Sequence, residues 1–338
     1  MTKRLNIALI GAGRIGQVHA TTIANRVVTA RLCAVYDPVL SAAKSTADRL
    51  GISTVAPSAD AIFQDDGVDA VLICTPTDTH APLVIAAAKA GKHIFCEKPV
   101  ALDLATTDAA IAAAKLAGVH FQIGFNRRWD SNYARVRAAI AGGEIGSLRT
   151  LHITSRDSNP PPISYVNTSG GIFLDMTIHD WDMFRFLSGS EIQQVYVQGG
   201  VMVDTAIGAA GDIDTHITLV RFESGVLGVV ENCRQAGYGY DQRVEAFGSL
   251  GAIQTENNRP NSAVISTVDG VRHALPHHFF MTRYTDSYAS EIEGFVDSVM
   301  QGKPVAVGGD DGRRALAVGL AAKLSYAEQR PVRVSEVG

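Results

Sequence analysis

The sequence predicts an N-terminal α/β domain with a doubly wound parallel sheet, followed by an α+β domain with an open, mostly antiparallel sheet. The chain has 338 residues, which is too long for one ordinary core and suits two domains of typical size. Short apolar runs alternate with helical patterns in the first third, as is typical of β-α-β units. After about residue 125, longer alternating strands joined by glycine-containing turns replace this pattern. We therefore expect domains at residues 1–125 and 126–338.

In the first domain, apolar strands should alternate with helices. The strands expected from the apolar runs are 5–10, 30–36, 68–74, 93–96 and 120–123. The helices expected between them are 14–25, 41–50, 80–90 and 104–117. Gly51, Gly91 and Gly118 follow three of these helices and can adopt the left-handed conformation that ends a helix. This order of elements predicts a doubly wound sheet.

The second domain should contain an antiparallel meander and a few helices. The strands expected in it are 215–222, 226–234 and 243–247, and the helices are 172–187, 284–300 and 310–328. Gly189 should end the first of these helices. Helices can cover only one face of such a sheet, so the other face must be covered from outside the domain. A second subunit is the cover we expect.

Composition and charge exclude several classes of function. The net charge of -4 and the pI near 6.2 leave no broad basic field, so we expect no nucleic-acid partner. The sequence contains neither a recognisable secretory signal nor an uninterrupted apolar stretch of membrane-spanning length, so we expect a cytoplasmic protein with no membrane partner. The cysteines, at positions 33, 74, 96 and 233, form no C-x-x-C pair. We therefore expect no metal.

Residues 11–16 read Gly-Ala-Gly-Arg-Ile-Gly and lie between a predicted strand and a predicted helix. In this context a G-x-G-x-x-G motif binds a dinucleotide. The first glycine permits a tight turn, the second lets the backbone approach a pyrophosphate, and the third lets the helix pack on the strand. The amides of the first helical turn and the helix dipole favour the anion. The alternative is an ordinary glycine turn without a ligand.

Asp37 strengthens the dinucleotide interpretation. It ends the second predicted strand, about 20 residues after the glycine loop, where an acidic side chain accepts hydrogen bonds from the adenosine ribose hydroxyls. A carboxylate at that position repels a 2′-phosphate. Pro38 and Val39 follow it, so no Arg or Lys is available there to bind that phosphate. Loop and carboxylate together predict a Rossmann domain that prefers NAD to NADP.

Two polar segments follow neighbouring strands of the first domain. Thr75-Pro76-Thr77, with His80 close behind, follows strand 68–74, and Glu97-Lys98-Pro99 follows strand 93–96. The carboxyl ends of parallel strands are where ligands bind in open α/β sheets. The ammonium group of Lys98 would there stabilise negative charge on a substrate oxygen and relay a proton. The alternative is that Lys98 is a solvated structural lysine.

Asp175 and His179 lie four positions apart on the predicted helix 172–187, so their side chains should share one helical face. A neutral imidazole held by a carboxylate can accept a hydroxyl proton while hydride leaves the same carbon. Oxidation of a secondary alcohol needs such a base. The alternative is that the two residues form a surface ion pair or a helix cap.

These features occur in an order that resembles the Gfo/Idh/MocA oxidoreductase family. The residues that carry the resemblance are 11–16, Cys96-Glu97-Lys98-Pro99 and the pair Asp175 and His179. The similarity covers nearly the whole chain. It implies a Rossmann domain that binds NAD, and Lys98, Asp175 and His179 as the catalytic triad. It also implies a homotetramer in which the open sheets of the second domains pack face to face.

Within the family, the sequence most resembles the members that oxidise inositols. The segments that carry this resemblance are 124–130, 155–162, 170–180 and 239–245. They imply oxidation of myo-inositol at its axial hydroxyl to scyllo-inosose. Trp129, Leu174 and segment 277–280 depart from the family pattern, and these departures bear on which inositol or sugar is the substrate.

The expected binding residues follow from the motifs and from the resemblance. The cofactor contacts are Gly11, Ala12, Gly13, Arg14, Ile15, Asp37, Thr75, Pro76, Thr77, His80, Glu97, Lys98 and Asn126. The substrate contacts are Lys98, Arg128, Asp157, Asn159, Asp175, His179, Tyr240 and Tyr284. A cyclitol carries a hydroxyl on every ring carbon, so its pocket must pair many donors and acceptors. The alternative for each substrate residue outside the triad is a surface or interdomain role.

Other functions remain open at this point. One is a dehydrogenase of another inositol isomer or of an aldose. Another is an NAD-dependent glycosidase of the same superfamily, which would recycle bound NAD and release no net NADH. A non-catalytic nicotinamide sensor would need the glycine loop and Asp37 but neither Lys98 nor the pair Asp175 and His179.

Overall fold

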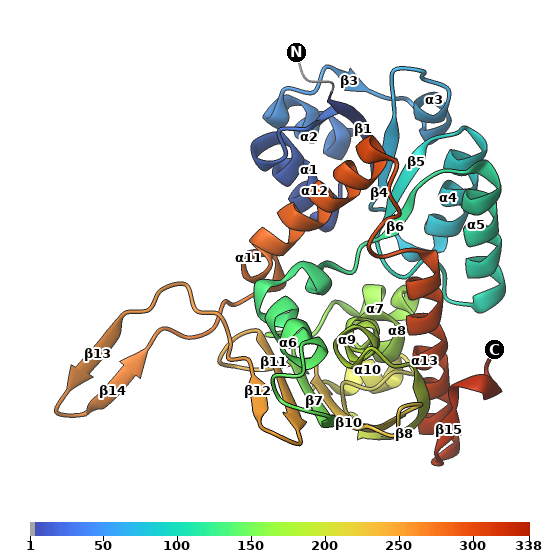
Figure 1. Ribbon diagram of the computed structural model, residues 1–338. Helices are drawn as coiled ribbons and strands as arrows, with labels where there is room; N and C mark the ends of the chain where they lie inside the picture. The colour runs from blue at the N-terminus through green and yellow to red at the C-terminus, as the bar shows by residue number, and fades with distance from the viewer. Residues whose placement is uncertain (1–3) are drawn as a thin grey trace. The chain divides into compact units, whose positions relative to one another are not determined.

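Figure 1 shows the computed structural model, which describes residues 4–338. The chain forms two compact units. The first extends to Trp129 and includes Asp286–Leu316, and the second contains Asp130–Thr285 and Ala317–Gly338. Residues 286–316 therefore belong to the first unit. We had expected them to be part of a second domain at residues 126–338.

The first unit contains a six-stranded parallel sheet in the order β3-β2-β1-β4-β5-β6. Its strands are β1 (Leu5–Ile10), β2 (Ala30–Tyr36), β3 (Thr54–Val55), β4 (Ala70–Ile73), β5 (His93–Cys96) and β6 (Phe121–Ile123). From β1 the chain forms β2 and β3 on one side of that strand. It then crosses to the other side of β1, where it forms β4, β5 and β6. The predicted doubly wound sheet is confirmed, with its switch point between β1 and β4.

Helices connect these strands. The four expected helices are present as α1 (Arg14–Arg26), α2 (Leu40–Leu50), α4 (His80–Lys89) and α5 (Leu104–Ala117). Gly51 and Gly118 follow α2 and α5 in the left-handed conformation, with φ of 66° and 67°. The sequence analysis missed α3 (Ala59–Phe63) and the two-residue strand β3. Elements this short carry too little periodicity to be recognised.

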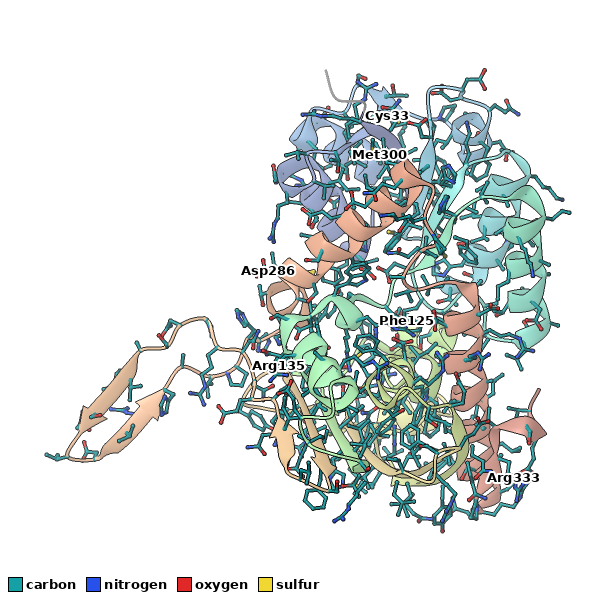
Figure 2. The ribbon with its side chains drawn as sticks, in the orientation of Figure 1. Cys33, Phe125, Arg135, Asp286, Met300 and Arg333 are labelled. Atoms are coloured by element: carbon teal, nitrogen blue, oxygen red, sulfur yellow. The ribbon has the colours of Figure 1, made fainter. Side chains whose placement is uncertain are left out.

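Helix α12 (Thr285–Gln301) packs on the sheet of the first unit, because Ile292, Phe295 and Val296 join the same hydrophobic core as Leu9 and Leu72. Asp286 and Met300, labelled in Figure 2, mark its two ends. The Asp286 carboxylate forms an ion pair of 2.9 Å with Arg26 of α1. This apolar face explains why the helix groups with the first unit.

The second unit contains a seven-stranded sheet in the order β12-β11-β7-β10-β9-β8-β15. Its strands are β7 (Leu148–Arg156), β8 (Ile192–Gly200), β9 (Thr215–Phe222), β10 (Leu227–Cys233), β11 (Asp241–Gly248), β12 (Ala252–Gln254) and β15 (Val332–Arg333). All neighbouring pairs are antiparallel except β10 and β7. The predicted mostly antiparallel sheet is confirmed.

One face of this sheet carries helices and the other exposes apolar side chains. The remaining helices are α6 (Ser131–Ala141), α7 (Ile163–Ser169), α8 (Ile172–Asp175), α9 (Ile178–Ser188), α10 (Thr205–Ala209), α11 (Phe280–Arg283) and α13 (Gly309–Glu328). Along β9, buried residues alternate with exposed ones, and Ile217 and Leu219 on the open face are 51% and 54% exposed. Leu227 of β10 and Phe247 of β11 are also exposed. An apolar open sheet face is typical of a surface that binds another protein chain.

A separate hairpin extends from the second unit. It consists of β13 (Val264–Thr267) and β14 (Gly270–His273), which pair antiparallel. Every residue of both strands is exposed. Figure 1 shows the hairpin projecting away from the rest of its unit. The sequence analysis did not identify these strands.

Candidate active site

The glycine loop has the geometry that its three glycines predict. Gly11 adopts a φ of 98°, and a Cβ at this position would lie 2.7 Å from the carbonyl of Cys74. A Cβ on Gly16 would lie 2.0 Å from the carbonyl oxygen of Gly11. A Cβ on Gly13 would meet no atom within 4 Å, and Gly13 precedes α1 without a side-chain cap. The loop therefore leaves open space and uncapped amides at the start of a helix, which fits a pyrophosphate.

Gly16 and Gly13 should respond differently to replacement by alanine. Replacing Gly16 with alanine should lower the free energy of unfolding by about 1–3 kcal/mol, because the new Cβ overlaps a backbone oxygen. Replacing Gly13 with alanine should leave the folded state intact and raise the Kd for NAD about tenfold or more, because the methyl group fills the space left for the pyrophosphate. Urea unfolding and fluorescence titration with NADH measure the two effects. Equal NAD affinity in wild type and Gly13→Ala would refute this role of Gly13.

The carboxylate of Asp37 is fixed at the end of β2. Its Oδ2 accepts a hydrogen bond of 2.7 Å from the Ala12 amide, and its Oδ1 accepts one of 2.7 Å from the Val39 amide. Asp37 is thus held beside the glycine loop, in the position from which such a carboxylate binds the adenosine ribose.

From this position we expect at least about tenfold higher kcat/KM with NAD than with NADP, or about 1.4 kcal/mol. Asp37→Ser combined with Pro38→Arg should move the preference towards NADP, because it removes a repulsive charge and adds a phosphate partner. Asp48→Ser, on an exposed residue of the same unit, is the matched control. Equal kcat/KM for both cofactors in the wild type would contradict the assignment.

The two polar segments of the first unit lie together at the carboxyl edge of its sheet. β4 and β5 pair in parallel with Ile73 opposite Cys96, so the segments 75–77 and 97–99 leave the sheet side by side. The Lys98–Pro99 peptide bond is cis. Asn126 follows β6, and its buried Nδ2 has no hydrogen-bond partner among residues 4–338. This arrangement fits the predicted nicotinamide end of the cofactor.

Three other residues of the first unit that we expected to bind a ligand make polar contacts with other residues of the chain. Both ring nitrogens of His80 lie 2.7 Å from backbone carbonyls. Glu97 Oε1 lies 2.7 Å from His19 Nε2. Arg128 donates a hydrogen bond of 2.9 Å to Asp311. Contact of these side chains with a ligand stays a prediction.

In the second unit, the expected continuous helix 172–187 was wrong. The chain forms α8, which ends at Asp175, and a separate helix α9, which begins at Ile178. The Thr177 amide donates to the carbonyl of Ile172, five positions back, and the Asp180 amide donates to that of Thr177. Asp175 therefore ends one helix and His179 lies in the first turn of the next, so they do not share the face of one continuous helix.

A buried polar network holds this break. Thr177 Oγ1 lies 2.5 Å from Asn232 Oδ1 and 2.9 Å from His216 Nε2, and Thr218 Oγ1 lies 3.0 Å from His216 Nδ1. Asn232 Nδ2 also donates to Asp180 Oδ2 at 3.0 Å. Since Thr177 can donate only once, His216 is best satisfied with its proton on Nε2. The network thus ties the first turn of α9 to strands β9 and β10.

Burial lowers the pKa of His216 to about 3, and the charge of Arg234 adds to this effect. Unfolded His216 binds a proton below about pH 6.5, whereas the folded protein resists it down to about pH 3. His216 should therefore lower the free energy of unfolding by up to about 1.4 kcal/mol per pH unit as pH falls through this window. Urea unfolding at pH 7 and pH 5 tests this, with His216→Gln beside His273→Gln on the exposed hairpin. The same slope in both variants would contradict it.

Asp175 is held by two residues that the sequence analysis missed. Tyr165 donates a hydrogen bond of 2.8 Å to Asp175 Oδ1, and Arg234 donates one of 3.1 Å to Oδ2. Burial alone would lower the pKa of Arg234. The nearby negative charges outweigh this effect and raise the pKa; they belong to Asp175, Asp157 and Asp212. The arginine is thus a permanent cation beside the Asp175 carboxylate. Its only sequence signal was a basic residue at the end of a predicted strand.

The other predicted substrate residues of the second unit differ in exposure. Asp157 is half-buried after β7, and Asn159 is exposed with its Nδ2 3.4 Å from His278 Nε2. Tyr240 and Tyr284 are buried and pack edge to face, with ring centroids 6.0 Å apart. The hydroxyl of Tyr284 lies 3.4 Å from that of Tyr133. Substrate contact stays a prediction for all four residues.

Comparison with known proteins identifies the family. Residues 5–125 match the family described as "Oxidoreductase family, NAD-binding Rossmann fold", and residues 133–254 match the "GFO/IDH/MocA C-terminal domain". The chain belongs to the Gfo/Idh/MocA oxidoreductase family. It therefore carries this family's NAD-binding Rossmann domain at residues 5–125.

Several members of the Gfo/Idh/MocA family are similar over their full length. The myo-inositol 2-dehydrogenase of Thermotoga maritima is 46% identical over 98% of this chain and 99% of its own length. The inositol 2-dehydrogenase of Rhizobium meliloti is 46% identical over 98% of this chain and 99% of its own length. The structure of scyllo-inositol dehydrogenase from Lactobacillus casei, with bound NAD(H) and scyllo-inositol, superposes with a TM-score of 0.92 at 29% identity, covering 98% and 100% of the two chains.

Residues 4–338 form no helix that is both long and apolar enough to cross a membrane. The same residues contain no group of three or more His, Cys, Asp or Glu side chains placed to hold a metal ion.

Proposed function

We propose that this protein oxidises myo-inositol at its axial hydroxyl to scyllo-inosose and reduces NAD to NADH. The observation that carries the proposal is 46% identity, over nearly the full length, to the inositol dehydrogenases of T. maritima and R. meliloti. The T. maritima relative is a myo-inositol 2-dehydrogenase, and the proposal therefore names this isomer.

In the proposed reaction, bound NAD serves as the hydride acceptor. An imidazole nitrogen of His179 accepts the proton of the reacting hydroxyl as the carbon–hydrogen bond breaks and the carbonyl forms. The Lys98 ammonium donates a hydrogen bond to the same oxygen and stabilises its developing negative charge. Asp175, fixed by Arg234 and Tyr165, orients the polyol and the base. Lys98, Asp175 and His179 are the catalytic residues in this proposal.

The proposal predicts a graded response to polyols. Purified enzyme with NAD is followed at 340 nm with myo-inositol, scyllo-inositol, the chiro-inositols and glucose. Myo-inositol should give the highest kcat/KM, and a deoxy-inositol that lacks a bound hydroxyl should lose at least about tenfold, because a buried polar partner is then left unsatisfied. Faster oxidation of scyllo-inositol or glucose would reassign the substrate. Absence of net NADH with every polyol would favour the glycosidase or sensor alternatives.

We also propose that the protein is a homotetramer assembled through the open sheet faces of its second units. The apolar side chains Ile217, Leu219, Leu227 and Phe247 support this, since water would otherwise cover them. Leu219→Lys combined with Leu227→Lys should break the assembly, because it places like charges in a contact between identical faces. Light scattering measures the mass, with Leu116→Lys on an exposed residue of α5 as control. A monomeric wild type would contradict the proposal.

A further inference from the structure

His80 joins two segments of the first unit beyond the end of the sheet. The last backbone hydrogen bond between β4 and the segment after β5 is donated by the Glu97 amide to the Ile73 carbonyl, at 3.0 Å. Past that point, the His80 ring lies between the segments, with Nδ1 2.7 Å from the Pro99 carbonyl and Nε2 2.7 Å from the Thr75 carbonyl. His80 is 2% exposed. Its ring fills the space between the residue after Lys98 and the chain that follows β4, and with its proton on Nδ1 it donates to the Pro99 carbonyl.

A second buried histidine fastens the residue before Lys98. His19 of α1 is fully buried, and its Nε2 lies 2.7 Å from Glu97 Oε1. Phe95 and Tyr288 pack edge-on against the His19 ring, each with a centroid distance of 5.3 Å. A Cβ on Gly124 would come within 3.0 Å of the Glu97 carboxylate, so the backbone closes its other side. The Glu97 side chain has little room to move.

These two contacts flank the backbone of Lys98. A lysine carries its charge at the end of a four-carbon stem, so a shift of the backbone moves the point from which that stem must reach the substrate. A displacement of about 1 Å can cost roughly a hundredfold in rate. We propose that His80 and His19 are positioning residues that hold Lys98 in its reactive placement by fixing Pro99 and Glu97. The inference rests on the proposed role of Lys98 in the reaction.

The chemistry of the two His80 contacts makes the inference testable by conservative variants. Both acceptors are carbonyls, and a neutral imidazole has one N–H to donate. Burial lowers the pKa of His80, against the effects of the two carbonyls and of Glu97, so a neutral ring is the form to imitate. An asparagine amide nitrogen can replace Nδ1 and reach Pro99, whereas a glutamine amide nitrogen can replace Nε2 and reach Thr75. Leucine fills the space and donates to neither.

The first test compares kcat and the Kd for NADH across these variants. His80→Leu should lower kcat about tenfold or more while the Kd changes less than about threefold. His80→Asn should recover most of the loss and His80→Gln much less, because only the first restores the bond to Pro99. In a Lys98→Ala background the effect of His80→Leu should largely disappear. Wild-type kcat in folded His80→Leu, or a loss explained by NADH affinity alone, would overturn the proposal.

The second test needs no substrate, so it separates failure of this inference from failure of the proposed function. The rate at which acetic anhydride acylates Lys98 is measured by mass spectrometry relative to Lys89, an exposed lysine of the same unit. His80→Leu and His19→Leu should change this rate several-fold, and His19→Gln, which keeps a donor for Glu97, should not. His120→Leu is the matched control. The His120 ring also contacts a backbone carbonyl, that of Lys303, but His120 lies before β6 and not beside Lys98 in the sequence. Unchanged Lys98 reactivity in both leucine variants would overturn the inference whatever the substrate proves to be.

Discussion

Replacing His179 with alanine should lower kcat/KM for polyol oxidation about 10²–10⁴-fold, because the hydroxyl proton then has no positioned acceptor. In the wild type, kcat/KM should rise with pH as the imidazole loses its proton, and the variant should lose this dependence. The measurement is the pH profile of NADH formation. The affinity for NADH should change little, because the glycine loop and Asp37 are untouched.

His273→Ala is the matched control for this variant, since it removes an imidazole from the exposed strand β14 of the same unit. Its rate and pH profile should equal those of the wild type. A His179→Ala enzyme with near wild-type turnover and an unchanged pH profile would refute the role of His179 as the base.

Lys98→Ala should lower kcat about a hundredfold or more if the ammonium meets the developing negative charge on the substrate oxygen. The Kd for NADH should change much less, because the charge acts on the oxygen rather than on the cofactor. Steady-state kinetics and fluorescence titration separate the two quantities. Lys89→Ala, at the end of α4, controls for the loss of a positive charge. An effect confined to NADH binding would make Lys98 a cofactor residue only.

The sequence predicted the first sheet well because its signals are local. Buried parallel strands appear as short apolar runs, and glycines such as Gly51 and Gly118 mark where helices end. The packing of α12 on this sheet could not be predicted in the same way. Its apolar face was recognisable, but the core it joins consists of residues such as Leu9 and Leu72, more than two hundred positions earlier in the chain.

The break between α8 and α9 shows a second limit of sequence reasoning. The apolar pattern over residues 172–187 is helical throughout, yet the chain interrupts the helix at Met176 and Thr177. The cause is the bond from Thr177 to His216 and Asn232, which lie 39 and 55 positions away. Long-range polar contacts of this kind leave no periodic signal in the sequence.

For the candidate site, the motifs predicted roles for the glycine loop, Asp37, Lys98, Asp175 and His179. They did not reveal what holds these groups. Arg234 and Tyr165 hold Asp175, and His19 holds Glu97. These partners lie on other elements and reach the site only through the tertiary fold, so no local spacing points to them.

The transfer of deuterium from labelled substrate tests the central claim most directly. Myo-inositol carrying deuterium on C2, the carbon of the axial hydroxyl, is incubated with NAD and the enzyme, and the mass of the NADH formed is measured. The account predicts NADH heavier by one deuterium, together with scyllo-inosose that has lost the label. NADH without deuterium, or no NADH at all, would contradict hydride transfer from this carbon.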